Sequence, residues 1–423
     1  MTQNTMRRRE LVLFFIVLAA AAFGNGLSDS VYANYFKDAF HVTTTQRAFI
    51  EFPRELPGLL CALVITLLSA YGMARTNLVA QLCAFSGLLA LALLAPSFGV
   101  MLVFLFINSM GLHISLPMND AIGMAIAEPD QVGKRIGQYA SVRTAMGFAA
   151  GLLVFFGFRY NVFSFTREIN VLFLIGAGAF LVAIVASVLL VRRKVPALSV
   201  ARKKRQKLVF RKEYKYYYFV TMLNGVQKQI ALVFGSWVII ELLGKKADTM
   251  SLLMITVSFV SIFFMRLLGR WIDRLGVKRM MYLDALTFIF VYIVYGFVVW
   301  GITGKFIPGT GWPAFAIYAL FIMDRLSMQI GVVKAVYLRS IAVKPEEIPS
   351  TLSTGTSLDH VVAIIAAQFS GLVWTLWGAQ WVFFIAAFFS LGNLFVAWKI
   401  PKDKTVKTDP TALQEDLLTE ETA

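Results

Sequence analysis

The chain contains a series of apolar runs, each about 20 residues long, between residue 11 and residue 399. A run of that length crosses the hydrocarbon core of a bilayer as one helix. Transmembrane strands would instead need segments of about ten residues with alternating hydrophobicity, and the runs do not alternate. Only 15% of the residues are charged, whereas soluble domains average about 25%. The sequence therefore predicts an all-α membrane protein.

Twelve transmembrane helices account for the apolar runs. Their boundaries are accurate to a few residues, and they cover residues 11–36, 49–70, 76–95, 99–122, 136–158, 169–191, 214–243, 248–269, 279–301, 313–338, 350–375 and 379–399. We expect residues 1–191 to form an N-terminal six-helix bundle and residues 214–400 a C-terminal one. Residues 192–213 are predicted to be a basic cytoplasmic linker. Residues 401–423 are polar and acidic, which predicts a disordered cytoplasmic tail.

The charge distribution predicts the orientation in the membrane. The net charge is +16, and most Lys and Arg residues lie in segments that the alternation of spans places on one side. Such a bias keeps those segments cytoplasmic, so both termini are expected in the cytoplasm and the protein in the inner (cytoplasmic) cell membrane. The cations form no continuous stripe, and we expect no nucleic-acid partner. Cys61 and Cys83 lie in apolar runs and indicate neither a disulfide nor a metal site.

The two halves of the chain repeat one another. The segment Gly269–Arg279 reads G-x-x-x-D-R-x-G-x-K-R, and an eroded copy lies at Leu67–Arg75, with Ser69 in the place of the acid. Asn25 and Gly26 in span 1 correspond to Asn224 and Gly225 in span 7. Glu128-Pro129 before span 5 corresponds to Lys344-Pro345 before span 11, and this register places Arg143 opposite Asp359. The matches agree in order and spacing.

The segment Gly269–Arg279 resembles the loop that joins the second and third helices of each half of a major facilitator superfamily transporter. With the repeated halves, the resemblance extends over residues 11–399. It implies two pseudo-symmetric six-helix bundles around a central cavity that opens to each side of the membrane alternately. It also implies a conformational latch in this loop, formed by Gly269, Asp273, Arg274, Gly276 and Lys278. Because Ser69 replaces the acid in the first half, the balance between conformations is expected to depend on Asp273.

Ionisable groups inside the bilayer cost at least about 2.5–3.5 kcal/mol, so each needs a partner or a wet cavity. Spans 1, 4, 5, 7, 10 and 11 line the cavity in the resembled family. Polar residues recur at helical spacing on one face of spans 1 and 7. The predicted solute-binding residues are Asn25, Asp29, Tyr32, Arg143, Asn224, Gln227, Lys228 and Asp359.

Two charge pairs follow from the repeat. Asp29 and Lys228 are expected to face each other, or a solute, from equivalent positions. Arg143 and Asp359 are expected to form a second pair, with His360 beside them. Salt bridges that only hold the bundles together are the alternative interpretation of each charge. The candidates for proton coupling, whose pKa burial can move, are Asp29, Asp324, Asp359 and His360.

Three further sets of titratable residues in the predicted spans are interpreted from their immediate sequence neighbours. Glu51, Arg54 and Glu55 are spaced i, i+3, i+4 at the start of span 2, which predicts an ion-pair cluster within one helix. His113 lies among apolar residues and is expected to be a hydrogen-bonded interior histidine. Lys334 in span 10 is expected either to extend toward the cytoplasm or to contact solute.

We predict a secondary active transporter that moves a small charged or zwitterionic organic solute, coupled to H⁺. Alternatives are a multidrug or lipophilic-cation:proton antiporter, and a non-transporting sensor or lipid-handling protein on the same fold. The sequence contains no H-E-x-x-H, G-x-S-x-G or phosphate-binding loop, so an enzyme is not predicted. No cofactor or metal is expected, and the expected partners are the solute, the coupling ion and the lipid bilayer around a monomer.

Overall fold

The computed structural model describes residues 3–127, 132–165, 170–199, 210–344 and 347–400. Within these ranges, nine helices are long and apolar enough to cross a membrane. One of them, α11 (Ala247–Thr303), contains two of the predicted spans. The predicted spans 49–70 and 214–243 correspond to the charged helix α3 (Thr44–Leu68) and to the interrupted segment that begins with α9 (Lys215–Gln229). The fold is the predicted all-helical membrane architecture with twelve spans.

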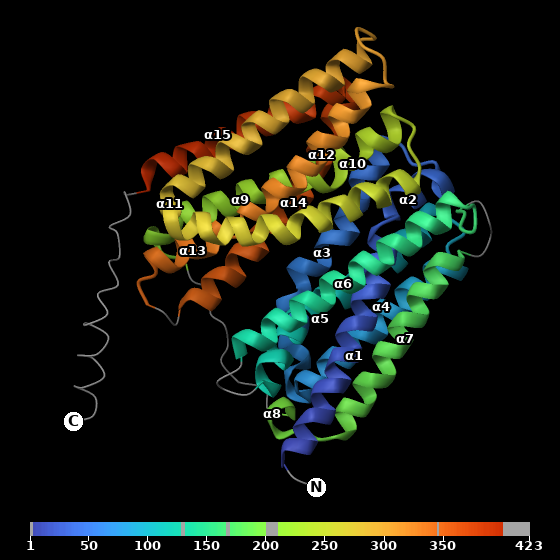
Figure 1. Cartoon of the computed structure of the whole chain (residues 1–423), viewed down its shortest axis with the longest axis vertical. Coiled ribbons are helices and arrows are strands. Elements are labelled where there is room, and N and C mark those ends of the chain that lie inside the picture. The colour runs from blue at the N-terminus through green and yellow to red at the C-terminus, as the bar shows by residue number, and fades with distance from the viewer. Residues whose placement is uncertain (1–2, 128–131, 166–169, 200–209, 345–346, 401–423) are drawn as a thin grey trace.

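The helices form two groups that Figure 1 shows side by side. The N-terminal group contains α1 (Gln3–Asp29), α2 (Tyr32–Phe40), α3, η1 (Ser69–Tyr71), α4 (Met73–Leu93), α5 (Phe98–Ile126), α6 (Val132–Arg159) and α7 (Val171–Arg192), followed by the short α8 (Pro196–Ser199). The C-terminal group begins with η2 (Lys212–Tyr214) and α9, and continues through η3 (Ile230–Phe234), α10 (Gly235–Trp237), η4 (Val238–Leu242), α11, α12 (Trp312–Ile330), α13 (Val333–Ile341), α14 (Ile348–Trp377) and α15 (Ala379–Lys399). The predicted tail 401–423 and the centre of the predicted linker lie outside the described residues.

Three spans that we expected to be continuous are interrupted. Span 1 breaks between α1 and α2, where the Ser30 hydroxyl donates to the Gly26 carbonyl at 2.6 Å. Span 10 breaks at Gly331 and Val332, between α12 and α13. In span 7 the α-helix changes to π-helix at η3 and again at η4. Interrupted helices and π-helical turns occur frequently at binding sites in membrane transporters.

The two halves share the same turn after their second span. Gly72 has φ 82° and ψ 161°, and Gly276 has φ 75° and ψ 170°. Side chains are disfavoured at such positive φ values, so each position favours glycine. The equal conformations support the alignment of Leu67–Arg75 with Gly269–Arg279. We call the end of the bundles that carries both turns and the N-terminus the basic end, and the other end the opposite end.

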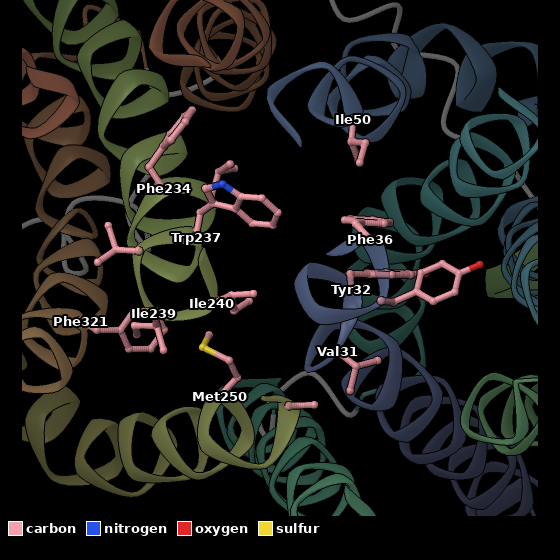
Figure 2. Close-up of a cluster of buried hydrophobic side chains, with 14 of the residues drawn as sticks. Val31, Tyr32, Phe36, Ile50, Phe234, Trp237, Ile239, Ile240, Met250 and Phe321 are labelled. Atoms are coloured by element: carbon pink, nitrogen blue, oxygen red, sulfur yellow. The ribbon is translucent and has the colours of Figure 1, made fainter. Parts of the chain in front are cut away.

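The largest buried hydrophobic cluster extends across the two halves. Figure 2 shows Tyr32 and Phe36 of α2 and Ile50 of α3 on one side, with Trp237 and Ile240 on the other. Helices α2 and α10, which carry Tyr32, Phe36 and Trp237, lie toward the opposite end, and the halves diverge toward the basic end (Figure 1). The burial of this cluster holds the halves together at the opposite end.

Polar contacts close the opposite end. Lys37 of α2 forms an ion pair with Glu241 at 2.7 Å and donates to the Ile240 carbonyl at 2.9 Å. The Asn34 side chain donates to the Lys245 carbonyl at 3.4 Å. The indole N–H of buried Trp237 donates to the Thr44 hydroxyl at 3.1 Å. Each bond joins the N-terminal half to the C-terminal half.

Helices α3 and α14 make the closest contact between the halves. A Cβ added at Gly371 would lie 2.4 Å from the Cβ of Ala48, and one at Gly58 would lie 2.4 Å from the His360 ring. The Gln368 side chain donates to the Ala48 carbonyl at 2.9 Å. Glycine at these two positions therefore permits the close approach that brings the functional groups of α3 and α14 together.

Candidate functional site

A buried ionic cluster joins the two halves at mid-height, and we call it the central bridge. Lys228 of α9 donates from Nζ to Glu55 Oε2 of α3 at 2.8 Å and to Asp359 Oδ2 of α14 at 2.9 Å. His360 Nδ1 lies 2.6 Å from the same Glu55 oxygen. The four side chains are 11–16% exposed. Glu55 is the only member from the N-terminal half, so one carboxylate carries both bonds across the interface.

A second layer of polar groups supports the central bridge from within the C-terminal half. The Asn224 amide donates to Asp359 Oδ1 at 2.9 Å, and Lys334 Nζ donates to Asn224 Oδ1 at 2.5 Å. Asn224 and Lys228 are one helical turn apart and therefore share a face of α9. Gly225 lets α9 approach α14, because an added Cβ would lie 2.6 Å from the Asp359 carbonyl oxygen. The structure thus brings Asn224, Lys228, Asp359 and His360 together, and their roles in solute binding and proton coupling stay predictions.

Asp29 does not face Lys228, which corrects the first predicted pair. The nearest cation to Asp29 is Arg54 of α3, at 4.0 Å, and the Asp29 side chain is 47% exposed. Lys228 is instead held by Glu55 and Asp359, and the break after Asp29 ends the helical spacing that would have aligned Asp29 with Tyr32. Tyr32 instead lies buried inside the N-terminal half, where its hydroxyl donates to Asn108 at 2.8 Å. Asn25 is half-buried one turn before Asp29.

Arg143 does not pair with Asp359, which corrects the second predicted pair. Its guanidinium lies 3.3 Å from Asp120 of α5, and both side chains are at least one-third exposed. Helix α14, which carries Asp359, packs against α3, whereas α6, which carries Arg143, packs against α11. Gln227 also turns away from the central bridge, because its amide donates to Ser390 of α15 at 3.1 Å.

The predicted ion-pair cluster within α3 is present in part. Glu51 Oε1 accepts from Arg47 at 2.6 Å and from Arg54 at 2.9 Å. Arg47 and Glu51 are each only 2% exposed. Glu55 leaves this cluster and joins the central bridge instead. Because the two arginines already neutralise Glu51, Glu55 can form an ion pair with Lys228 of the other half.

Two other interior groups lie near the bridge or within the C-terminal half. His113 contacts the Ser109 carbonyl at 2.9 Å, as expected, and its ring also lies edge-on to His360 at 5.2 Å. Asp324 is fully buried, and neither of its carboxylate oxygens has a hydrogen-bond partner among the described residues. The neighbouring Arg325 donates to Ser236 at 3.3 Å. A role for Asp324 in proton coupling stays a prediction.

The predicted latch segment forms the turn within α11. Asp273 and Arg274 are exposed, and the Asp273 side chain forms no hydrogen bond or ion pair with another described residue. Lys278 donates to the carbonyls of Trp398 at 3.2 Å and Ile400 at 2.6 Å, which ties the turn to the end of α15. Gly269 is exposed before the turn. A latch residue would be unpaired in a conformation whose halves are apart at the basic end. The latch role of Asp273 stays a prediction.

Sequence reasoning missed Glu55 and left Lys334 undecided. The i, i+3, i+4 spacing of Glu51, Arg54 and Glu55 predicted that all three charges pair within one helix. Glu55 was therefore not considered as a partner for the other half. The available signal was that Glu55 lies between Pro53 and Pro57, where interrupted helical bonding marks a special position. For Lys334 the signal was Gly331, at which span 10 breaks.

Twelve helical spans in two halves, with a buried ionic cluster where the halves meet, define a polytopic membrane protein of the carrier type. The sequence profile of the Major Facilitator Superfamily matches residues 14–324 and 217–420. The chain belongs to this family, which indicates a transporter. A search of curated protein sequences finds no match.

Solved structures of transporters have the same fold. A nucleoside transporter, NupG, is similar with a TM-score of 0.74 and 14% identity, over 93% of this chain and 100% of that one. An auto-inhibited POT family peptide transporter gives a TM-score of 0.73 with 13% identity, over 94% and 98%. A D-xylose-proton symporter gives 0.69 with 15% identity, over 93% and 98%. At these identities the similarity establishes the fold alone.

Proposed function

We propose that this protein is a secondary active transporter that moves a small charged or zwitterionic organic solute by alternating access, coupled to protons. The observation that carries the proposal is the central bridge. One oxygen of Glu55 accepts bonds from both Lys228 and His360 across the interface of the halves. Protonation of this one carboxylate therefore weakens both contacts at once.

The composition of the bridge favours an anionic group on the solute. Lys228 is shared between Glu55 and Asp359, so a solute carboxylate or phosphate can replace one acid without leaving the ammonium unpaired. A neutral apolar solute would offer Lys228 no replacement partner, and an unpaired buried charge is costly. Arg143 and Asp29 lie more exposed in the N-terminal half, where they can bind the solute's second charged group.

A proton can take the place of the solute at Glu55. Protonated Glu55 no longer accepts an ionic bond from Lys228, which then belongs to Asp359 alone. This gives a route by which proton binding and solute binding both loosen the same contact between halves. Proton-coupled transport is named for one similar structure, the D-xylose-proton symporter.

The charge bias supports a cytoplasmic basic end. In that orientation both termini are cytoplasmic, the membrane is the cell membrane, and the described conformation opens inward. The lipophilic-cation antiporter remains the rival within transport. It requires an acid but not Lys228, whereas our proposal requires both.

The test uses the full chain in sealed proteoliposomes with an internal pH dye and an imposed pH gradient. Amino acids, organic acids, nucleosides and lipophilic cations are added in turn, and a coupled solute changes the internal pH. We expect Lys228→Ala and Arg143→Ala to abolish or strongly weaken the response, and Arg339→Ala, an exposed cation at the basic end, to leave it intact. Unchanged uptake in both Lys228→Ala and Arg143→Ala would refute the site.

Proton coupling is tested separately with Glu55→Gln. This change keeps the size of the side chain but removes the titratable group. We expect exchange of solute across the membrane to continue while accumulation driven by the pH gradient is lost. Accumulation at the wild-type level would exclude Glu55 from coupling.

A further inference from the structure

A groove on the outer face of the N-terminal half lies between the first turns of α1 and the end of α7. These two helices pack along their length, and Figure 1 shows them side by side near the N-terminus. The groove has a volume of about 390 Å³. Three arginines and three apolar residues line it: Arg8, Arg9, Val12, Leu13, Leu189 and Arg193.

The three arginines carry positive charge that no described residue neutralises. Arg8, Arg9 and Arg193 are all exposed, and none forms an ion pair with another described side chain. Arg8 begins the apolar stretch of α1, and Arg193 directly follows the apolar helix α7. The arginines therefore lie at the level where the hydrocarbon core meets the lipid headgroups.

An apolar surface continues from the arginines toward the middle of the membrane. Val12 and Ile16 of α1 are 51% and 39% exposed, and Leu189 and Val185 of α7 are 43% and 54% exposed. On each helix these side chains are one turn apart, so an exposed apolar surface continues from the groove away from the charged end. The site thus offers a cationic pocket followed by an apolar channel.

We infer that this groove is a binding site for an anionic phospholipid in the leaflet at the basic end. The guanidinium groups would hold the phosphate headgroup with charge-assisted hydrogen bonds, and the acyl chains would lie along α1 and α7. Basic pockets between transmembrane helices at that leaflet suit anionic headgroups. A free phosphate matches the cations but leaves the apolar channel uncovered, so the combined site selects the lipid.

The test measures retention of phosphatidylglycerol by the purified full chain with native mass spectrometry, with phosphatidylcholine as the comparison lipid. The variant Arg8→Gln/Arg9→Gln/Arg193→Gln removes three charges. Each cation near an anionic surface contributes about fivefold to affinity, so we expect binding to weaken by about a hundredfold. The matched control, Arg266→Gln/Arg270→Gln/Arg339→Gln, removes three exposed charges from the C-terminal half.

A second variant tests the groove without changing charge. Leu189→Trp fills the apolar channel and is expected to weaken phosphatidylglycerol binding severalfold. Equal losses in the arginine variant and the control would refute the site, as would full retention in both the arginine variant and Leu189→Trp. Displacement of the lipid by an equal concentration of inorganic phosphate would also refute it, because the site would then bind only the anion.

Discussion

The contact between α3 and α14 predicts that Gly371→Ala opens the opposite end. The new methyl group would lie 2.4 Å from the Cβ of Ala48, whereas carbon atoms in ordinary contact are about 3.5–4.0 Å apart. The helices would have to separate by about 1 Å or more. That movement stretches the bond from Gln368 to Ala48, now 2.9 Å, and the contact between the hydroxyls of Thr45 and Thr375, now 3.1 Å.

The size of the effect follows from these terms. Overpacking a tight contact costs about 1–3 kcal/mol, and each lost hydrogen bond costs about 1 kcal/mol. The closed arrangement therefore loses at least about 3 kcal/mol relative to the open one. Since every 1.4 kcal/mol is tenfold, the ratio of the two conformations shifts about a hundredfold toward the form that is open at the opposite end.

Spin labels across this end report the shift as a distance. With Cys61 and Cys83 replaced by serine, labels at Gln46 and Trp377, which are both exposed, lie on the two helices at the contact. We expect a second, longer distance in Gly371→Ala measured by electron double resonance. Gly178→Ala is the control, because a Cβ there meets no atom within 4 Å.

A distance distribution in Gly371→Ala that matches Gly178→Ala would refute the reasoning. It would mean that the close approach of α3 and α14 does not hold the opposite end closed. Loss of folded protein is detected independently by size-exclusion chromatography.

Three further predictions use the same structure. Trp237→Phe and Thr44→Val each remove the same hydrogen bond between the halves, and each should favour opening by about 1 kcal/mol. The double variant should add little more. Additive effects in the same distance measurement would contradict this. Asp273→Asn should change accessibility labelling of the two ends more than a change at the equivalent position in the first half, and equal labelling would oppose a latch role. Hydrogen bonding from Arg211 lowers the pKa of Glu347 below its usual 4.5, so their bond, 2.8 Å long, is complete above pH 4.5 and is lost as the pH falls through the lowered pKa. Proteolysis of the linker should therefore accelerate only in acid, and Glu347→Gln should make it fast at neutral pH.

The sequence was sufficient to predict the fold because membrane helices can be recognised from the length and apolar composition of their segments. The i, i+4 spacing of Asn224 and Lys228 fixed a shared helical face before any tertiary structure was known, but the repeat paired Lys228 with Asp29 and Asp359 with Arg143, whereas the structure pairs Lys228 with Asp359. The pairing of Asp29 with Lys228 failed because a break in span 1 cannot be derived from its apolar pattern. Glu55 was missed because its spacing from Arg54 predicted an ion pair within the same helix. Its observed pairing with Lys228 depends on the approach of α3 to α9, which the sequence does not specify.

The closure of the opposite end has a consequence for how the protein tolerates mutation. Lys37, Asn34 and Gln368 all donate to main-chain carbonyls of the other half. Every residue type presents that carbonyl, so substitutions at the acceptor positions cannot delete these bonds. The acceptor positions can therefore be substituted freely with respect to these bonds, whereas the donor positions require a side chain that can donate a hydrogen bond. Correlated substitutions at this end are therefore expected at the pairs of side chains, Lys37 with Glu241 and Trp237 with Thr44, and not at the three carbonyl acceptors.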